Sequence, residues 1–229
     1  MECPKEGTSS ESQAHGVILS DSRCWGIWNM DWTGFALDDL MIVCQRGARV
    51  ESFERIETRF SFSVMDRVSF KLALGVNNIL DGESARVVMG KLLGLRAHLM
   101  ECYPMSLVVF GDVCPVNLDL YTSISGRPSR VSTLDANLAI EELNGLIHVE
   151  NKLTHDFYPR GGSAPFLAQG VNRTRKVIGP DGKAYSGPVT RWGQLPDGLH
   201  VKDECKRYWI KSFIKSFGID RGTFASCTI

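Results

Sequence analysis

The sequence has no long hydrophobic run. None of its apolar stretches reaches the roughly 18 residues that a membrane-spanning helix needs. Residues 1–16 are polar and contain no apolar segment of the kind found in signal peptides. We therefore expect a protein that neither spans a membrane nor is exported, and we place it in the cytoplasm.

An excess of charge of either sign is also missing. Lysine and arginine together number 26, as do aspartate and glutamate, so the formal net charge at pH 7 is zero. Such a protein has no overall field that attracts nucleic acid or an anionic membrane, although a local basic patch is compatible with this balance. The composition therefore gives no support for a nucleic-acid partner.

Paired cysteines and metal-ligand patterns are absent as well. The seven cysteines are odd in number and show no CxxC spacing, which predicts free thiols in a reducing compartment. The five histidines lack the spacing of zinc ligands, and no glycine loop of the phosphate-binding type occurs. We expect neither a metal nor another cofactor.

Short apolar segments alternate with helical patterns along the chain. The apolar segments are predicted strands, at about 16–20, 41–44, 68–74, 105–110 and 146–149. The helical patterns lie between and after them, at about 25–40, 51–60, 84–102, 130–145 and 203–217. This alternation predicts an α/β protein with a mainly parallel, five-stranded sheet.

The apolar spacing also predicts which residues of these helices face inward. For 51–60 they are Phe53, Ile56 and Phe60, and for 84–102 they are Ala85, Val88, Met89, Leu92, Leu95 and Leu99. For 130–145 they are Leu134, Leu138 and Leu143, with Ser132 or Thr133 as the N-cap. Charged and polar residues occupy the remaining faces.

One long segment breaks the alternation. Residues 155–196 contain five of the nine prolines and form either a functional loop or a disordered insertion. The turn sequence 179–182, Gly-Pro-Asp-Gly, predicts a small hairpin within it. We expect a flap whose Phe166, Tyr185 and Trp192 line a substrate pocket. The predicted organisation is a disordered leader over 1–15, one domain over 16–220 that includes this insertion, and a tail over 221–229.

Polar residues that suit acyl transfer follow the predicted strands. Ser22 comes after the first strand, Gly47 after the second and Asn77 after the third, while Asp197 and His200 precede the last helix. A serine nucleophile needs a histidine to take its proton, and the imidazole needs a partner on its other nitrogen. The tetrahedral oxyanion needs N–H donors, which a glycine amide and an asparagine side chain can supply.

In this order the residues resemble the SGNH (GDSL-like) hydrolase family. The matching blocks are Ser20-Asp21-Ser22, Gly47, Gly75-Val76-Asn77-Asn78 and Asp197-Gly198-Leu199-His200, spread over residues 16–217. The resemblance implies a three-layer α/β/α, flavodoxin-like fold. It also implies Ser22 as nucleophile, His200 as general base and then acid, and Asp197 as its orienting partner. The Ser22 and Gly47 amides and the Asn77 side chain would form the oxyanion hole.

Two positions depart from the family pattern. Ser20 stands where the family usually has glycine, and Asn78 stands where it usually has aspartate. The Arg-Gly-Ala and Asp-Gly-Leu-His segments also look similar to the esterase domains of retrotransposon open reading frames.

The sequence thus predicts a serine esterase that cleaves a small-molecule carboxylic ester, acyl or acetyl, through an acyl-enzyme. The alternative is a weakly active or inactive module of the same fold, of retroelement origin, that binds RNA or a protein partner through a basic terminal helix. Cys24 is a further candidate nucleophile, two residues beyond the expected turn.

Overall fold

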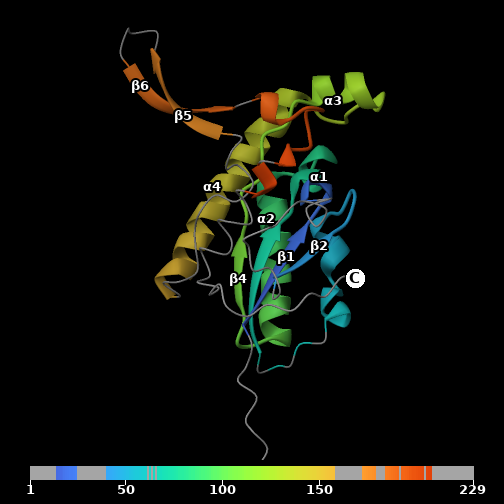
Figure 1. Cartoon of the computed structure of the whole chain (residues 1–229), viewed down its shortest axis with the longest axis vertical. Helices are drawn as coiled ribbons and strands as arrows, with labels where there is room; N and C mark the ends of the chain where they lie inside the picture. Colours follow the sequence, from blue (N-terminus) through green and yellow to red (C-terminus); the bar gives the residue numbers. More distant parts are fainter. Residues whose placement is uncertain are drawn as a thin grey trace, which may run out of the picture.

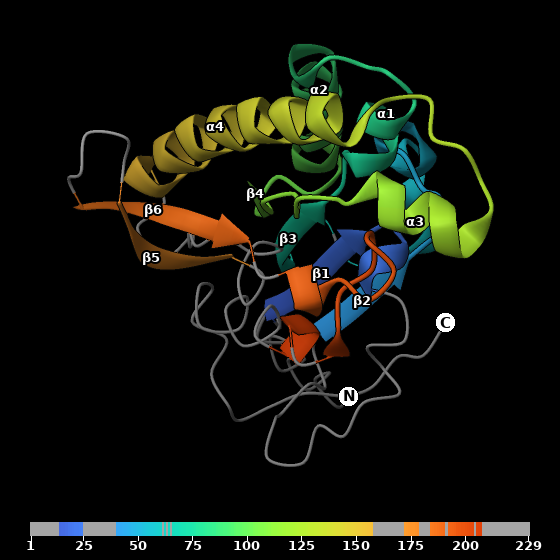
Figure 2. The same cartoon turned by 90° about the horizontal axis from the view of Figure 1, so that it is seen from above.

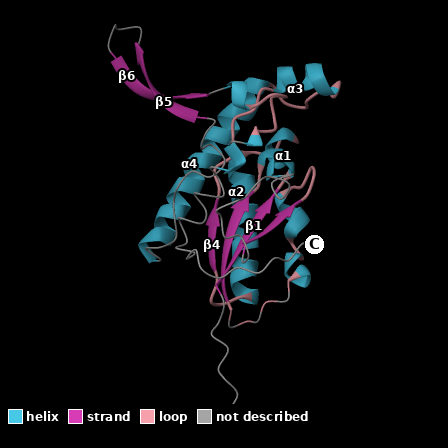
Figure 3. Cartoon of the chain, in the orientation of Figure 1, coloured by secondary structure: helices cyan, strands magenta, loops and turns pink. Residues whose placement is uncertain are grey.

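The protein is built on a parallel sheet of four strands (Figures 1 and 3). The computed structural model describes residues 14–24, 40–60, 62, 64, 66–157, 172–178, 184–190, 192–203 and 205–207. The four strands are β1 (Ala14–Ser20), β2 (Leu40–Cys44), β3 (Arg67–Ala73) and β4 (Leu107–Phe110). Their spatial order is β2-β1-β3-β4, the order of a flavodoxin-like sheet without its last strand.

The central strand β1 is buried on both faces of the sheet, which explains its unbroken apolar sequence. Val17 and Leu19 point into the main hydrophobic core, while Ile18 and Ser20 are buried on the opposite face. Strand β1 pairs in parallel with β2 on one side and with β3 on the other. The carboxyl ends of these three strands therefore lie side by side.

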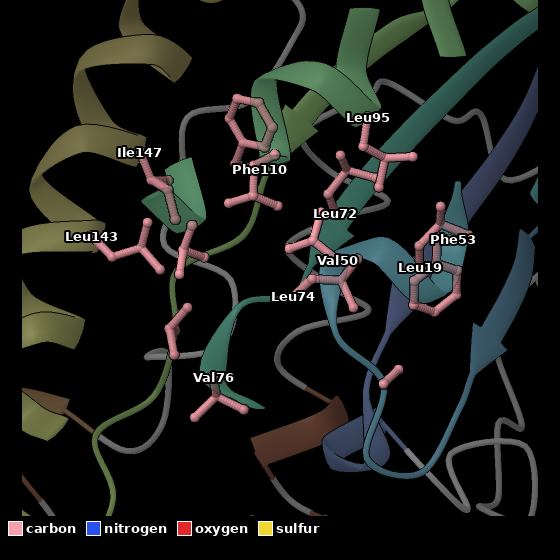
Figure 4. Close-up of a cluster of buried hydrophobic side chains, with 14 of the residues drawn as sticks. Leu19, Val50, Phe53, Leu72, Leu74, Val76, Leu95, Phe110, Leu143 and Ile147 are labelled. Carbon is pink, nitrogen blue, oxygen red and sulfur yellow. The ribbon is translucent and has the colours of Figure 1, made fainter. Parts of the chain in front are cut away.

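Two long helices cover one face of the sheet (Figure 2). They are α2 (Ala85–Cys102), capped by Ser84, and α4 (Thr133–Phe157), capped by Ser132. Figure 4 shows Leu143 and Ile147 of α4 beside Phe110 of β4 in the core. The six predicted inward residues of α2 are all buried, so this prediction is confirmed.

The predicted fifth strand at 146–149 is wrong, because these residues belong to α4. Three asparagines of α4, spaced seven residues apart, face the segment 110–116. Each side chain accepts from the N–H and donates to the C=O of one residue in that segment: Asn137 with Val116, Asn144 with Val113, and Asn151 with Phe110. Helix α4 thus pairs through Asn151 with Phe110, the last residue of the edge strand β4, and through Asn144 and Asn137 with the segment that follows it.

This ladder of asparagines also sets the rotation of α4. Leu143 is buried as predicted, but Leu134 and Leu138 are 68% and 56% exposed, so their predicted inward orientation is wrong. The buried positions are instead Ala136, Ile140, Leu143, Ile147 and Asn151.

The predicted helix at 51–60 is also wrong in type. The segment forms two short 3₁₀-helices, η3 (Val50–Phe53) and η4 (Ile56–Arg59), separated by Glu54 and Arg55. Phe53 and Ile56 are nevertheless buried, because a spacing of three residues places side chains on one face of a 3₁₀-helix as well as of an α-helix.

The predicted hairpin is confirmed as the antiparallel pair β5 (Asn172–Ile178) and β6 (Ala184–Thr190). Figure 1 shows it beyond the carboxyl ends of the sheet strands, at the same end as α1 (Val76–Leu80) and α3 (Leu118–Ser125). None of the helices in the described part of the chain is both long and apolar enough to cross a membrane. The predictions for 1–13, 25–39, 208–217 and 221–229 lie outside the described residues.

Candidate active site

The candidate site lies at the carboxyl ends of β1, β2 and β3. In an open parallel sheet, ligands bind at the topological switch point, where the order of the strands in the sheet reverses. In the order β2-β1-β3-β4 this point lies at β1, because β2 is on one side of it and β3 and β4 are on the other. Ser22 begins the short helix η1 (Ser22–Cys24) directly after β1, and Asn77 lies in α1 just after β3. Gly47 follows β2, with a φ of 66° that only glycine adopts readily. The fold therefore gathers three of the predicted residues at one edge.

A buried ion pair fixes the turn that carries Ser22. The Asp21 carboxylate accepts from the Arg23 backbone N–H (3.0 Å), from Nε (3.1 Å) and from Nη2 (3.0 Å). Both side chains are fully buried, whereas Ser22 between them is half-buried. Because these hydrogen bonds join the residues on either side of Ser22, they restrain the backbone of the turn that carries it.

His200 is held by Asp197 from the other side of the cleft. Oδ2 of Asp197 accepts from His200 Nδ1 (2.6 Å), and Oδ1 accepts from the backbone N–H groups of Leu199 (3.0 Å) and His200 (2.7 Å). Burial acts to raise the pKa of the Asp197 carboxyl, but these hydrogen bonds outweigh it and hold the pKa below its ordinary value. The carboxylate is therefore ionised at neutral pH and acts only as an acceptor.

The loop bearing Asp197 and His200 rests on the start of α3. Asn117 donates its backbone N–H to the Gly198 carbonyl (2.7 Å), and Gly198 has a φ of 80°. A Cβ atom on Gly198 would lie 2.1 Å from the Asn117 oxygen, which is far inside contact distance. Only glycine fits at this close approach, and the loop position depends on it.

The structure brings Ser22 and His200 into contact. The Ser22 Oγ lies 3.0 Å from His200 Nε2, although the two residues are 178 positions apart in the sequence. Since Asp197 occupies Nδ1–H, the lone pair of Nε2 faces the serine hydroxyl. This arrangement can remove the hydroxyl proton.

The residues predicted for the oxyanion hole line the same cleft. Ser22, Gly47, Asn77 and His200 all border a cleft of about 470 Å³. One N–H of the Asn77 side chain donates to the Ala48 carbonyl (2.8 Å), which holds the loop after β2 in place. An asparagine amide carries two N–H groups, so the second is able to serve a ligand.

Both departures from the family pattern have a local structural account. No residue other than glycine has a positive φ in the described ranges, so Ser20 needs no left-handed backbone. Asn78 is buried, accepts from the Val50 N–H (3.1 Å) and donates to the carboxylates of Glu51 (3.0 Å) and Glu83 (3.1 Å). An aspartate there could not donate to two carboxylates.

Some predicted residues do not reach the cleft. Cys24 is fully buried, and Trp192 is 44% exposed and is not among the residues that line the cleft. Phe166 and the Tyr185 side chain lie outside the described residues.

Other lining residues were not singled out from the sequence, namely Arg46, Tyr121, Arg127, Leu199 and Lys206. The sequence carried a signal for two of them, since Arg46 is adjacent to Gly47 and Leu199 is adjacent to His200.

Known proteins resemble this chain in fold rather than in sequence. No protein-family model and no curated protein sequence matches it. A GDSL-like lipase from Bacteroides thetaiotaomicron VPI-5482 is similar with a TM-score of 0.54 and 15% identity over 88% of this chain and 85% of that one. A member of the lipolytic G-D-S-L family from Veillonella parvula DSM 2008 is similar with a TM-score of 0.53 and 15% identity over 90% of this chain and 99% of that one. The chain therefore has the fold predicted from its motifs, that of the SGNH (GDSL-like) hydrolases.

Proposed function

We propose that the chain is a serine esterase that hydrolyses a small carboxylic ester, acyl or acetyl, through an acyl-enzyme. The observation that carries the proposal is the continuous contact from Ser22 Oγ to His200 Nε2 and from His200 Nδ1 to Asp197. A protein that only binds a partner has no need of a hydroxyl, an imidazole and a carboxylate in this order. The likeness in fold to solved lipolytic proteins is consistent with it.

In the first half-reaction the Ser22 oxygen attacks the acyl carbon while His200 Nε2 takes the hydroxyl proton. The ionised Asp197 stabilises the imidazolium that forms. The carbonyl oxygen becomes an oxyanion and receives hydrogen bonds from the Ser22 and Gly47 amides and from Asn77. When the intermediate collapses, the ester C–O bond breaks and the alcohol leaves with the proton from His200.

In the second half-reaction water replaces the alcohol. His200 takes a proton from the water as its oxygen attacks the acyl carbon of the Ser22 ester. Collapse of this second intermediate returns the proton to Ser22 Oγ and releases the carboxylic acid. The protein ends in its starting state, and no group other than the substrate and water is consumed.

The alternative, a binding module without activity, relied on a basic terminal helix at 203–217. Only 203 and 205–207 of that helix belong to the described residues, so the described part of the chain does not test this alternative. The five cysteines in the described ranges are free thiols, which supports a location in a reducing, cytoplasmic compartment.

Hydrolysis of 4-nitrophenyl acetate tests the proposed function. We expect Ser22→Ala and His200→Ala each to lower kcat by at least about 10³-fold, because the first removes the nucleophile and the second removes the base that activates it. Matched controls are Ser129→Ala, an exposed serine, and His98→Ala, whose ring contacts Glu57, since neither residue lines the cleft. Equal activity of Ser22→Ala and the wild type would contradict the assignment of Ser22 as nucleophile.

A further inference from the structure

Three basic side chains line the cleft beside Ser22. They are Arg46, next to Gly47 at the end of β2, Arg127, two residues past the end of α3, and Lys206, six residues after His200. They come from three separate parts of the sequence and converge on one cleft. Arg46 and Arg127 are exposed residues that also line the cleft.

The charged side chains that line the cleft, leaving His200 aside, are all positive. Among the described residues that line it, none is a carboxylate. Asp197 lies behind His200 and is engaged by it, and the Lys206 ammonium pairs with Asp203 (2.9 Å) at the cleft margin. The whole chain has no net charge, so this local excess of positive charge does not follow from the composition of the chain.

The oxyanion does not need this charge. The tetrahedral intermediate carries one negative oxygen, for which Ser22, Gly47 and Asn77 already supply N–H donors. The two exposed arginines are suited to bind a second, permanent negative charge on the substrate, because a guanidinium binds carboxylate or phosphate oxygens in a bidentate geometry. A basic cleft also raises the local concentration of an anionic substrate.

We infer that the natural substrate is an ester that carries a carboxylate or phosphate group near the scissile bond, held by Arg46 and Arg127. This inference rests on the proposed esterase function and adds the charge of the substrate to it. The anionic group takes no part in bond making or breaking. It binds at the rim and places the ester carbonyl over Ser22.

Three acetyl esters of matched shape test the inference. They are 3-acetoxybenzoate, 3-acetoxyphenyl phosphate and the neutral 3-acetoxybenzamide, all of which release acetate and a phenol. We expect the wild type to prefer the anionic esters by about tenfold or more in kcat/KM, a preference that falls as ionic strength shortens the reach of the charges. The two anionic esters distinguish a carboxylate from a phosphate preference.

The three esters differ in intrinsic reactivity, which alone could produce a difference in kcat/KM. Variants of the arginines correct for this, because the intrinsic reactivity of each ester is the same for every variant. The ratio of kcat/KM for an anionic ester to kcat/KM for the neutral ester should fall about tenfold in Arg127→Gln and in Arg46→Gln, the loss expected for one charge-assisted contact. The control Arg86→Gln removes one exposed cation from α2, away from the cleft, and should leave the ratio unchanged. A ratio that stays the same in both cleft variants would overturn the inference and leave the esterase function intact.

Product binding separates this inference from the proposed function. Calorimetric titration of Ser22→Ala with 3-hydroxybenzoate and 3-hydroxybenzamide needs no turnover. We expect the anionic product to bind about tenfold more tightly and to lose that advantage in the Arg127→Gln background. Equal binding of the two products would overturn the inference, whether or not the wild type hydrolyses the esters.

Discussion

At the scale of single residues, Asn78 shows how a change from the family pattern can be compensated locally. Its amide joins the backbone of Val50 to two carboxylates, Glu51 and Glu83, which both pair with Lys91. The residue next to it, Asn77, keeps its side chain at the cleft. The neutral amide therefore supports the loop after β2 without entering the site itself.

Asn77 has two roles in this account, as a support for Ala48 and as an oxyanion donor. Asn77→Ala should lower kcat by roughly 10²–10³-fold with KM little changed, because the donor acts mainly on charge that develops in the transition state. Steady-state kinetics together with thermal unfolding measure both roles. A variant with near-normal kcat and a lowered Tm would show that Asn77 only supports the loop.

Two elements of structure position the site, and α4 is the first. Asn151 pairs with Phe110 at the end of the edge strand β4, where an exposed backbone would otherwise be open to pairing with another strand, and Asn144 and Asn137 pair with the segment after β4. The predicted strand at 146–149 failed because a short apolar run does not by itself distinguish a strand from a buried helix. The spacing of Asn137, Asn144 and Asn151 was visible in the sequence, and it keeps all three on one helical face.

Substitution of one of the three asparagines of α4 tests how much their hydrogen bonds contribute to stability. Asn151→Ala leaves the buried N–H and C=O of Phe110 without their side-chain partners and should cost about 2–4 kcal/mol of unfolding free energy. Urea denaturation measures the loss. The control Lys152→Ala, at the exposed next position, should stay within about 0.5 kcal/mol of the wild type. Similar stability of the two variants would contradict the role of the ladder.

The second positioning element is the loop that rests on α3. Gly198→Ala would push a methyl group into the Asn117 carbonyl and displace His200 from Ser22. We expect kcat/KM to fall by about 10²-fold, since a shift of about 1 Å in a reacting group has this effect. The control Gly193→Ala, where an added Cβ meets nothing within 4 Å, should keep its activity. Wild-type activity in Gly198→Ala would show that the loop has more freedom than the structure indicates.

At the scale of the whole molecule, the pH dependence of stability reports on the network around Asn78. Burial acts to raise the pKa of Glu51, but hydrogen bonds from Lys91 and Asn78 prevail and lower it from 4.5 to about 2. Because the folded pKa lies below the unfolded one, the contribution is complete above about pH 4.5 and is lost as the pH falls toward 2. We expect Tm to fall less steeply over this range in Glu51→Gln than in the wild type. Parallel curves of Tm against pH for the two proteins would contradict the contribution of Glu51 to stability.

The sequence was sufficient for the four strands of the sheet, for the inward face of α2 and for the residues at the strand ends. The strands β1 to β4 and the buried stripe of α2 followed from local patterns, and Ser22, Gly47, Asn77, Asp197 and His200 do line or support one cleft. Arg127 and Lys206 could not be assigned from the sequence, because only the folded chain brings the end of α3 and the segment after His200 to the same cleft. Long-range convergence of this kind leaves no local pattern.

The proposed mechanism requires that His200 activates Ser22 as a nucleophile. Labelling of the intact protein with a fluorophosphonate probe, followed by mass spectrometry of the labelled peptide, tests it most directly, because such probes react far faster with an activated serine than with an ordinary one. We predict one modified residue, Ser22, with labelling lost in Ser22→Ala and strongly reduced in His200→Ala. Labelling that persists in Ser22→Ala, or a wild-type protein that is not labelled at all, would contradict the account.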